Sequence, residues 1–420
     1  MTPRVLERLF AATALFLTSS ALFPLLRGVG DSTTLVQPPV DSRLSALTFG
    51  VYGIAGLLVF KRRTAVLELL AGNKLLFSLA GLAVLSIAWS GSPGATARAA
   101  VPLVLTTLLG VYLATAFRPV ELAGVLAWLL AGLVVASAAF ATLQPRYGLD
   151  HLRGDAWRGV FTTKNELGRI AVLSAAVWLV RAACRHGNVL VSLALAGVSL
   201  LVLHESGSKT GLIVLGLIGL FLVVLPALRA HSSIAVPSGA ALCGVGVLGG
   251  SWLVDHSDAA LQTVGASSTL TGRSEIWSAV WRMIWQHPWL GWGFGAFWRG
   301  VTGPSGQVWA AIGATPPHAH NGVLDLWLDL GAVGVLLFLG SFLVAIARAA
   351  RALRTAWSLE TVLPATLLVF LALYNVSEST LLHQHSLFWV LYTAVAVQLA
   401  QARRSEAVAS EYRVPLVGVS

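Results

Sequence analysis

The chain has 420 residues, of which 56% are hydrophobic and only 11% are charged. Such a composition cannot cover a water-exposed surface, so it excludes a soluble globular enzyme and a disordered chain, and two cysteines exclude a disulfide-stapled secreted scaffold. A net charge of +10 is typical of nucleic-acid binding in a soluble protein, but in so apolar a chain the cations belong mostly at membrane edges and in loops. We therefore predict an all-α polytopic membrane protein, with a channel, a transporter and a membrane enzyme all still open.

An apolar stretch must have about 20 residues to cross roughly 30 Å of hydrocarbon as a helix. Twelve stretches, some of them short or interrupted by polar residues, are predicted to be transmembrane helices: 9–26, 44–60, 66–90, 97–117, 121–143, 169–183, 188–204, 211–228, 238–254, 322–347, 360–376 and 386–402. The first stretch runs into a polar loop without a small-residue cleavage site, so we expect a span there and not a signal peptide.

These spans predict four parts of the chain. Nine helices with short loops fill 1–254, one large exported loop fills 255–321, three helices fill 322–402, and a cytoplasmic tail over 403–420 is expected to be disordered from residue 405. Only the exported loop is long enough for a structured extramembrane lobe.

Short basic loops place both termini in the cytoplasm by the positive-inside rule. The loops on that side carry Arg4, Arg8, Lys61, Arg62, Arg63, Arg118, Arg181, Arg185, Arg229, Arg348, Arg351, Arg354, Arg403 and Arg404. The opposite side is richer in cations than topology alone favours: Arg146, Arg153, Arg158, Lys164, Arg169, Lys209, Arg273, Arg282 and Arg299. Cys184 falls at a cytoplasmic edge and Cys243 inside a span, so no disulfide is expected in the exported loops.

The first candidate cluster leads into the sixth predicted span. Arg158, Lys164 and Arg169 lie close together in sequence with Asn165 and two threonines at a helix start, where free N–H groups and the helix dipole favour an anion. An anion-binding site is one interpretation, and an interfacial anchor with a helix cap is the other. Charge alone does not separate them.

The second cluster lies between the seventh and eighth spans. Lys209 is flanked there by Ser206, Ser208 and glycines at a helix start, a setting that suits a phosphate. The segment is not a Walker A loop, because the leading glycine and its spacing are missing. A salt bridge between Glu205 and Lys209 would explain the charge equally well.

The third cluster lies in the exported loop, where Arg273 begins a predicted helix. Trp277, Trp281, Trp285 and Trp289 follow at four-residue intervals, which places them along one slowly drifting stripe. Packing or a membrane-interface belt accounts for this stripe more readily than sugar stacking does. Arg273 itself could clamp a phosphate with its planar fork of donors.

The fourth cluster leads into the tenth span. His318 and His320 at i and i+2 make a poor metal site by themselves, and no acidic or cysteine residues accompany them at metal-ligand spacing. A membrane-edge histidine is better suited to act as a general base, unless it only packs or caps the helix. His383 and His385, near Glu378, could line the same cavity or form a polar rim.

These segments together resemble the bacterial O-antigen ligase and polymerase family. The pattern His320-Asn321-x-x-Leu324, followed by Gly331 and Gly334, is similar to the histidine motif that follows a long exported loop in that family. Three other segments resemble family signatures in the right order: Lys164–Gly168, Ser206–Lys209 and Gly272–Trp277. Lys209 departs from the arginine that members often carry there, which keeps the charge but loses the bidentate fork.

The resemblance implies a membrane glycosyltransferase of the GT-C type in the bacterial inner membrane, with its active site facing the periplasm. Such an enzyme takes glycan from an undecaprenyl diphosphate-linked O-antigen donor and transfers it to a lipid A-core acceptor. The resemblance also implies no metal, no cofactor and no nucleotide energy source. Polymerases of the family commonly have two sizeable exported loops, so the short segment 144–168 favours a ligase.

The mechanism that fits these residues uses cations for the leaving diphosphate and a histidine for the acceptor hydroxyl. We expect Lys164, Lys209 and Arg273, with Arg158, to hold the diphosphate, and His320 to take the proton, so that direct displacement inverts the anomeric carbon. Residues expected to support this site are Asn165, Ser206, Ser208, Asn321, His318, Glu378 and His383.

Two alternatives remain open from the sequence. A polymerase would use the same residues to extend a carrier-linked glycan. A transporter of small anions or lipids would use the basic cavity as a translocation site and His320 as a proton relay. Lys74, Asp325 and Asp329 inside the spans could serve proton-coupled transport, although structural ion pairing explains them at least as well. The cations gather at one membrane face, and no internal repeat or pair of broken helices is evident, which disfavours transport.

Overall fold

The computed structural model describes residues 3–21, 42–230 and 271–411. This part of the chain is almost entirely helical, since its two short strands, β1 (Leu149–Asp150) and β2 (Ala156–Trp157), only form a small antiparallel hairpin. The predicted all-α class is therefore confirmed. The predicted span 238–254, Cys243 and the beginning of the exported loop lie outside the described residues.

Every predicted span within the described part falls on one or two helices. These helices are α1 (Pro3–Thr18), α3 (Ser42–Lys61), α4 (Arg63–Gly72), α5 (Lys74–Leu85), α6 (Pro93–Ala116), α7 (Pro119–Leu143), α9 (Lys164–Ala183), α10 (Val189–Glu205), α11 (Lys209–Ala230), α16 (Gly322–Thr355), α17 (Leu359–Tyr374) and α18 (Leu387–Glu411). Four of them, α6, α7, α11 and α16, are long and apolar enough to cross a membrane, and the bent pair α4–α5 is a possible fifth. The protein is thus a multi-pass membrane protein, and the number twelve stays a prediction.

The predicted span 66–90 is not one straight helix. Its two parts, α4 and α5, meet at an angle of 97°, and a 3-10 turn at Ser86–Ala88 follows. Arg348 of α16 stabilises the bend, because its Nη1 donates to Asn73 Oδ1 at 2.9 Å and its Nη2 donates to the Gly72 carbonyl at 2.5 Å. Asn73 also donates to the Leu69 carbonyl. The Asn73 side chain and the Gly72 carbonyl at the bend are therefore paired within the protein.

Two other boundaries differ from the prediction. The backbone of α16 is interrupted at Gly331, whose φ of 65° and ψ of −169° are not helical. At the other end, α18 continues to Glu411. The predicted disorder from residue 405 is therefore wrong for residues 405–411.

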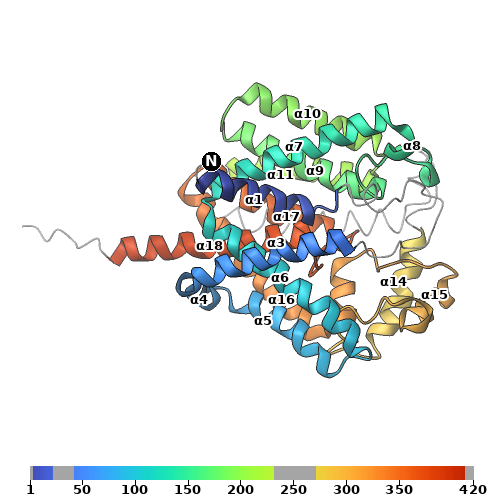
Figure 1. Ribbon diagram of the computed structural model, residues 1–420. Coiled ribbons are helices and arrows are strands. Elements are labelled where there is room, and N and C mark those ends of the chain that lie inside the picture. The colour runs from blue at the N-terminus through green and yellow to red at the C-terminus, as the bar shows by residue number, and fades with distance from the viewer. Residues whose placement is uncertain (1–2, 22–41, 231–270, 412–420) are drawn as a thin grey trace, which may run out of the picture.

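Loops that were predicted to share the cytoplasmic side do lie together. Arg4 Nη1 is 3.0 Å from Glu121 Oε1, and Arg62 Nη2 is 3.3 Å from Glu7 Oε1. We call this the basic end of the molecule. The start of α1 and the long end of α18 both lie on this side of Figure 1, whereas α14 (Thr271–Ile284) and α15 (Ser305–Ile312) lie at the opposite side, which we call the lobe end.

The core positions α9 at the centre of one half of the bundle. This helix packs against α7, α10, α11 and α17, and a second group pairs α6 with α3 and α18. A separate small core around Val280, Phe297 and Leu328 joins α14 to the first half of α16.

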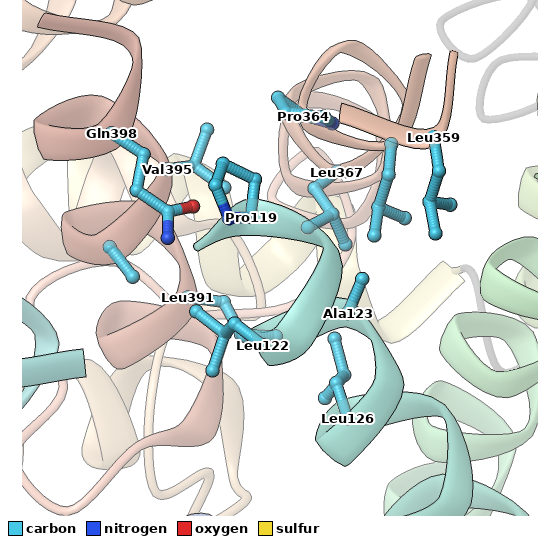
Figure 2. A pocket seen from close by; sticks show the side chains of 12 residues that line it. Pro119, Leu122, Ala123, Leu126, Leu359, Pro364, Leu367, Leu391, Val395 and Gln398 are labelled. Carbon is cyan, nitrogen blue, oxygen red and sulfur yellow. The ribbon is translucent and has the colours of Figure 1, made fainter. Parts of the chain in front are cut away.

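An apolar cavity lies among α7, α17 and α18 (Figure 2). It is lined by Leu122, Leu367 and Leu391, with Gln398 as its polar residue, and it offers no charged group for chemistry.

Candidate active site

Five segments converge at the lobe end. They are the start of α9, the turn between α10 and α11, the start of α14, the residues just before α16, and the loop 375–386 between α17 and α18. We call the polar cluster that they form the convergent site.

The start of α9 presents Lys164 through a reciprocal cap. Thr163 Oγ1 accepts a hydrogen bond from the Glu166 backbone N–H at 3.3 Å, and Glu166 Oε2 accepts one from the Thr162 N–H at 3.0 Å. Lys164 and Asn165 therefore occupy the first helical turn, where the helix dipole favours an anion. Lys164 Nζ lies 3.7 Å from where a Cβ on Gly207 would be, so it reaches the turn between α10 and α11.

The two serines of that turn are buried and hold its backbone. Ser206 Oγ donates to the Leu203 carbonyl and accepts from the Ser208 N–H, while Ser208 Oγ accepts from the Gly211 N–H. A Cβ on Gly168 would lie only 2.6 Å from Ser208 Cβ, which shows how closely α9 approaches the turn. The structure therefore brings the first two predicted clusters together.

The charged groups beside this turn do not pair as one alternative expected. Lys209 is exposed at the start of α11, and Glu205 lies 3.3 Å from the neighbouring His204 Nδ1. The described residues thus show no Glu205–Lys209 salt bridge.

Arg158 has a different environment from the other predicted cations. It is only 2% exposed, and its Nε donates to the Tyr147 carbonyl at 3.0 Å, while its N–H donates to the Gly148 carbonyl. These bonds close the hairpin that precedes α9. The geometry favours a structural role for Arg158 over direct contact with a substrate.

Glu378 is the central carboxylate of the convergent site. Its Oε1 lies 3.5 Å from Arg273 Nη2, and its Oε2 lies 3.8 Å from His320 Nδ1. Burial alone would raise the pKa of Glu378, but the contact with His320 and the charges of Arg169, His320 and Arg273 outweigh it and lower the pKa to about 2. Glu378 is therefore an anion at any physiological pH.

The two histidines of the fourth cluster differ in protonation chemistry. His318 Nδ1 accepts a hydrogen bond from the His320 N–H at 3.1 Å, which leaves its proton on Nε2. Burial lowers the pKa of His318, and the neighbouring charge of His320 lowers it further, to about 3. His318 is thus a neutral donor, and His320 is the histidine that faces the carboxylate.

The backbone around His320 is fixed from several directions. His320 has a φ of 52°, an uncommon conformation for a residue with a side chain. The preceding Ala319 N–H donates to both carboxylate oxygens of Asp325, and its carbonyl accepts from Trp277 Nε1 at 2.9 Å. Asn321 caps α16 through Oδ1 and donates from Nδ2 to the Val376 carbonyl. These bonds join the histidine segment to the lobe and to the loop that carries Glu378.

Sequence reasoning did not assign two residues that the structure places here. Arg169 follows Gly168 on α9, its charge interacts with those of Glu378 and His383, and its Nε is buried without a hydrogen-bond partner among the described residues. Asp325 accepts bonds from Ala319, from Trp298 Nε1 at 2.7 Å and from Ser379 Oγ. Arg169 was counted in the first cluster and among the outer-side cations but received no role in the site, although its position beside Gly168 was the available signal.

The two histidines of the loop 375–386 contact different parts of the protein. His383 is exposed and close enough to His318 and Arg169 for their charges to interact. His385 is turned to the other half of the bundle, where its Nδ1 lies 3.0 Å from the Tyr52 hydroxyl and its N–H donates to Thr106. His383 therefore lines the convergent site, and His385 bridges α3 and α6.

The same geometry offers three donor atoms for a metal ion. Donor atoms of His318, His320 and Glu378 all lie within 4.8 Å of one another. Sequence spacing did not predict this set of three donors, because Glu378 is far along the chain from the two histidines. Arg273 and Arg169 already place two positive charges beside the single negative charge of Glu378. These charges disfavour a bound metal cation there.

One comparison with known proteins bears on the family. Residues 191–339 match the family model described as O-antigen ligase. Over this stretch the chain is similar to the O-antigen ligase family. No curated protein matches the chain.

The matched O-antigen ligase domain covers part of the convergent site. It runs from α10 through Leu339 of α16 and includes the serine turn, Arg273 and His320. Lys164, Arg169 and Glu378 lie outside the match, and the fold brings them to it. The resemblance predicted from the motifs is confirmed, and the family implies O-antigen ligase or polymerase-like activity in lipopolysaccharide biosynthesis.

The lowered pKa values of His318 and Glu378 predict that the folded protein loses stability in acid. The unfolded chain takes up a proton at His318 below pH 6.5, whereas the folded protein resists it to about 3, and the same holds for Glu378 between 4.5 and about 2. Stability should therefore fall as pH decreases from 6.5. His318→Gln should flatten this fall between pH 6.5 and 4.5, where Glu378 is still ionised in both states. Thermal melting of the purified protein across this range measures the effect, and an unchanged slope in His318→Gln would disprove it.

Proposed function

We propose that the protein is an O-antigen ligase of the bacterial inner membrane. It transfers glycan from undecaprenyl diphosphate to lipid A-core oligosaccharide at a site that faces the periplasm. The observation that carries this proposal is the pairing of one buried carboxylate, Glu378, with both Arg273 and His320, beside further cations. A base and a set of phosphate ligands are the two parts that this reaction needs.

The first part is a carboxylate–histidine pair. Glu378 is ionised and faces His320 Nδ1, so it favours the tautomer that carries the proton on that nitrogen. Nε2 of His320 is then the basic nitrogen, and it accepts the proton of the acceptor sugar hydroxyl. Glu378 also stabilises the imidazolium that results, as a carboxylate does in other catalytic histidine pairs.

The second part is a group of cations for the leaving diphosphate. Lys164, Lys209, Arg273 and Arg169 are assigned to this group, because negative charge builds up on the diphosphate as the sugar–phosphate bond breaks. Burial lowers the pKa of Arg273 and the charge of Glu378 raises it, and a guanidinium stays protonated under such opposing effects. Arg158, first expected among the diphosphate ligands, is assigned to hold the hairpin before α9.

The reaction balances without another reagent. The acceptor oxygen forms a bond to the anomeric carbon, the bond from that carbon to the diphosphate oxygen breaks, and the diphosphate leaves with the electron pair. The acceptor proton moves to His320. Attack from the face opposite the leaving group inverts the anomeric carbon, and neither a metal nor a nucleotide is required in this scheme.

The polymerase is the second candidate, and the exported loops bear on it. The segment 144–168 is a compact unit of one helical turn, α8 (Pro145–Gly148), followed by the β1–β2 hairpin. It forms no second lobe, and this favours the ligase. A transporter is not supported, because backbone groups at the interruption of α16 are paired within the protein: the N–H groups of Ala332 and Val333 donate to the carbonyls of Pro288 and Trp289.

Acceptor choice tests the ligase against the polymerase. Purified protein would be reconstituted with undecaprenyl diphosphate-linked glycan and either lipid A-core or more carrier-linked glycan, and the products would be separated on gels. A ladder of modified lipid A-core supports the ligase. Lengthening of the carrier-linked glycan without that ladder would replace it with the polymerase.

The cation assignment predicts a defect in donor use. Arg273→Ala should raise the KM for the donor about 10- to 100-fold, since a hydrogen bond to a charged group contributes about 1.5–3 kcal/mol. Lys209→Arg should retain donor use because the charge is kept. Arg282→Ala is the matched control, because Arg282 is exposed on the same helix. Equal KM values for Arg273→Ala and Arg282→Ala would contradict the assignment.

A further inference from the structure

The interruption of α16 is filled by a segment of the lobe. A continuous helix would pair the carbonyls of Leu328 and Asp329 with the N–H groups of Ala332 and Val333, but the backbone of Gly331 prevents this. The carbonyls instead accept from Trp292 and Gly293, and the N–H groups donate to Pro288 and Trp289. All four groups freed by the interruption are therefore paired with residues 288–293.

The other side of this segment is tied to the end of α5. Trp89 Nε1 donates to the Leu290 carbonyl at 3.0 Å, and the Phe294 N–H donates to Ser86 Oγ at 3.0 Å. A Cβ on Gly291 would lie 2.6 Å from the Asp329 backbone, and one on Gly293 would lie 2.6 Å from Ser90 Cβ. The segment is thus wedged between α5 and α16 with its backbone bonds satisfied, which is the condition for irregular backbone at membrane depth.

The depth of the segment follows from an anchor at the basic end. Arg348 bonds to Gly72 and Asn73 there, so α16 and α5 start from the same level. From Arg348 back to Gly331 is about 26 Å along a helix with 1.5 Å rise, and from Lys74 to Trp89 is about 23 Å. Measured from the basic end, both helices therefore reach residues 288–290 at a height close to the roughly 30 Å thickness of the hydrocarbon core.

Three apolar side chains of this segment face outward, beside the exposed polar residues Gln286 and His287. Trp285 is 64% exposed, Trp289 70% and Leu290 43%, and the flanking helices expose Leu85 and Leu336 to 65% each. In contrast, Trp277 is packed against the lobe core and bonded to Ala319. The tryptophan stripe therefore divides into an inner part, Trp277, that supports the site and an outer part, Trp285 and Trp289, whose rings are largely exposed. The ring of Trp285 contacts that of Trp281.

We propose that residues 285–290 form a membrane anchor of the lobe, with Trp285, Trp289 and Leu290 inserted into the lipid of the outer interface. Tryptophan prefers this boundary because its ring is apolar and its N–H is polar. The anchor fixes α14, and with it Arg273, at the height of the lipid surface. This inference concerns the membrane and does not depend on the reaction proposed above.

Spin labels test the anchor in the full chain. Cysteines would be introduced one at a time at Trp285, Trp289 and Leu290 in a variant with Cys184→Ala and Cys243→Ala, and the labelled proteins would be reconstituted in lipid vesicles. Leu336→Cys supplies a lipid-facing reference on α16, and Thr315→Cys supplies an exposed reference in the lobe. The readout is the ratio of collisions with oxygen to collisions with a water-soluble nickel chelate.

We expect this ratio at the three positions to shift from the value at Thr315 toward the value at Leu336. Each substituted side chain is already exposed, so the three variants should fold, and monodisperse elution checks this for each. A ratio equal to that at Thr315 at all three positions would overturn the proposal.

Discussion

Replacing His320 with glutamine is expected to lower the turnover of glycan transfer by about 100- to 10,000-fold, the usual contribution of a general base. Glutamine preserves size and hydrogen bonding but cannot accept the proton of the acceptor hydroxyl. Donor binding should be largely unchanged, because the diphosphate is assigned to Lys164, Lys209, Arg273 and Arg169. The measurement is a comparison of transfer rates at saturating donor, with donor affinity determined separately.

The control for this prediction is His151→Gln. His151 is exposed and pairs with Asp155 in the hairpin before α9, and no hydrogen bond or ion pair in the described part of the chain joins its side chain to Glu378, Arg273 or His320. It should leave both rate and affinity unchanged. Near wild-type transfer by His320→Gln, or a loss of donor binding in place of turnover, would show that His320 is not the base.

The second large effect is expected at Gly331. Its φ of 65° and ψ of −169° are accessible almost only to glycine, and a Cβ there would lie 2.2 Å from the Trp289 backbone. Backbone strain alone should lower the free energy of unfolding of Gly331→Ala by about 1–3 kcal/mol, and the steric overlap adds to this. We expect a lower thermal midpoint and loss of the wedge between α5 and α16.

Gly216→Ala in α11 is the matched control. A Cβ at Gly216 meets no atom within 4 Å, and the helical backbone there accepts alanine. Thermal melting in the same detergent compares the two variants. An unchanged midpoint in Gly331→Ala would show that the interruption of α16 can be relieved at no cost.

Sequence periodicity and motifs predicted the parts of this protein that depend on local pattern. Apolar runs located the helices, and basic loops correctly grouped Arg4 and Arg62 at one end, because both signals are properties of the chain itself. The bend at Asn73 and the interruption at Gly331 were not predicted. Each depends on groups from distant segments, Arg348 in one case and residues 288–293 in the other.

The candidate site likewise has residues that local motifs predicted and residues that only the fold brings together. The motifs identified Lys164, Arg273 and His320 from residue type and spacing. Glu378 was named only as a supporting residue near two histidines, because nothing in a single sequence reveals that the loop 375–386 folds against the start of α16. The buried bonds of Ser206 and Arg158 likewise show that a polar residue in a motif can serve the backbone and not a ligand.

The same lesson applies to metal binding. Spacing along the chain argued against a metal at His318 and His320, yet the fold adds Glu378 to the pair. Only the surrounding charge of Arg273 and Arg169 now favours a base over a metal ligand at His320. These two functions of one histidine lead to opposite expectations in the presence of a chelator.

The most direct test of the account is therefore the rate of glycan transfer by the purified, reconstituted protein in excess chelator, with wild type and His320→Gln side by side. The account predicts that wild type forms the lipid A-core ladder at its full rate with chelator present, and that His320→Gln forms almost none. A wild-type protein that is inert in chelator and regains transfer when a divalent metal is restored would contradict it.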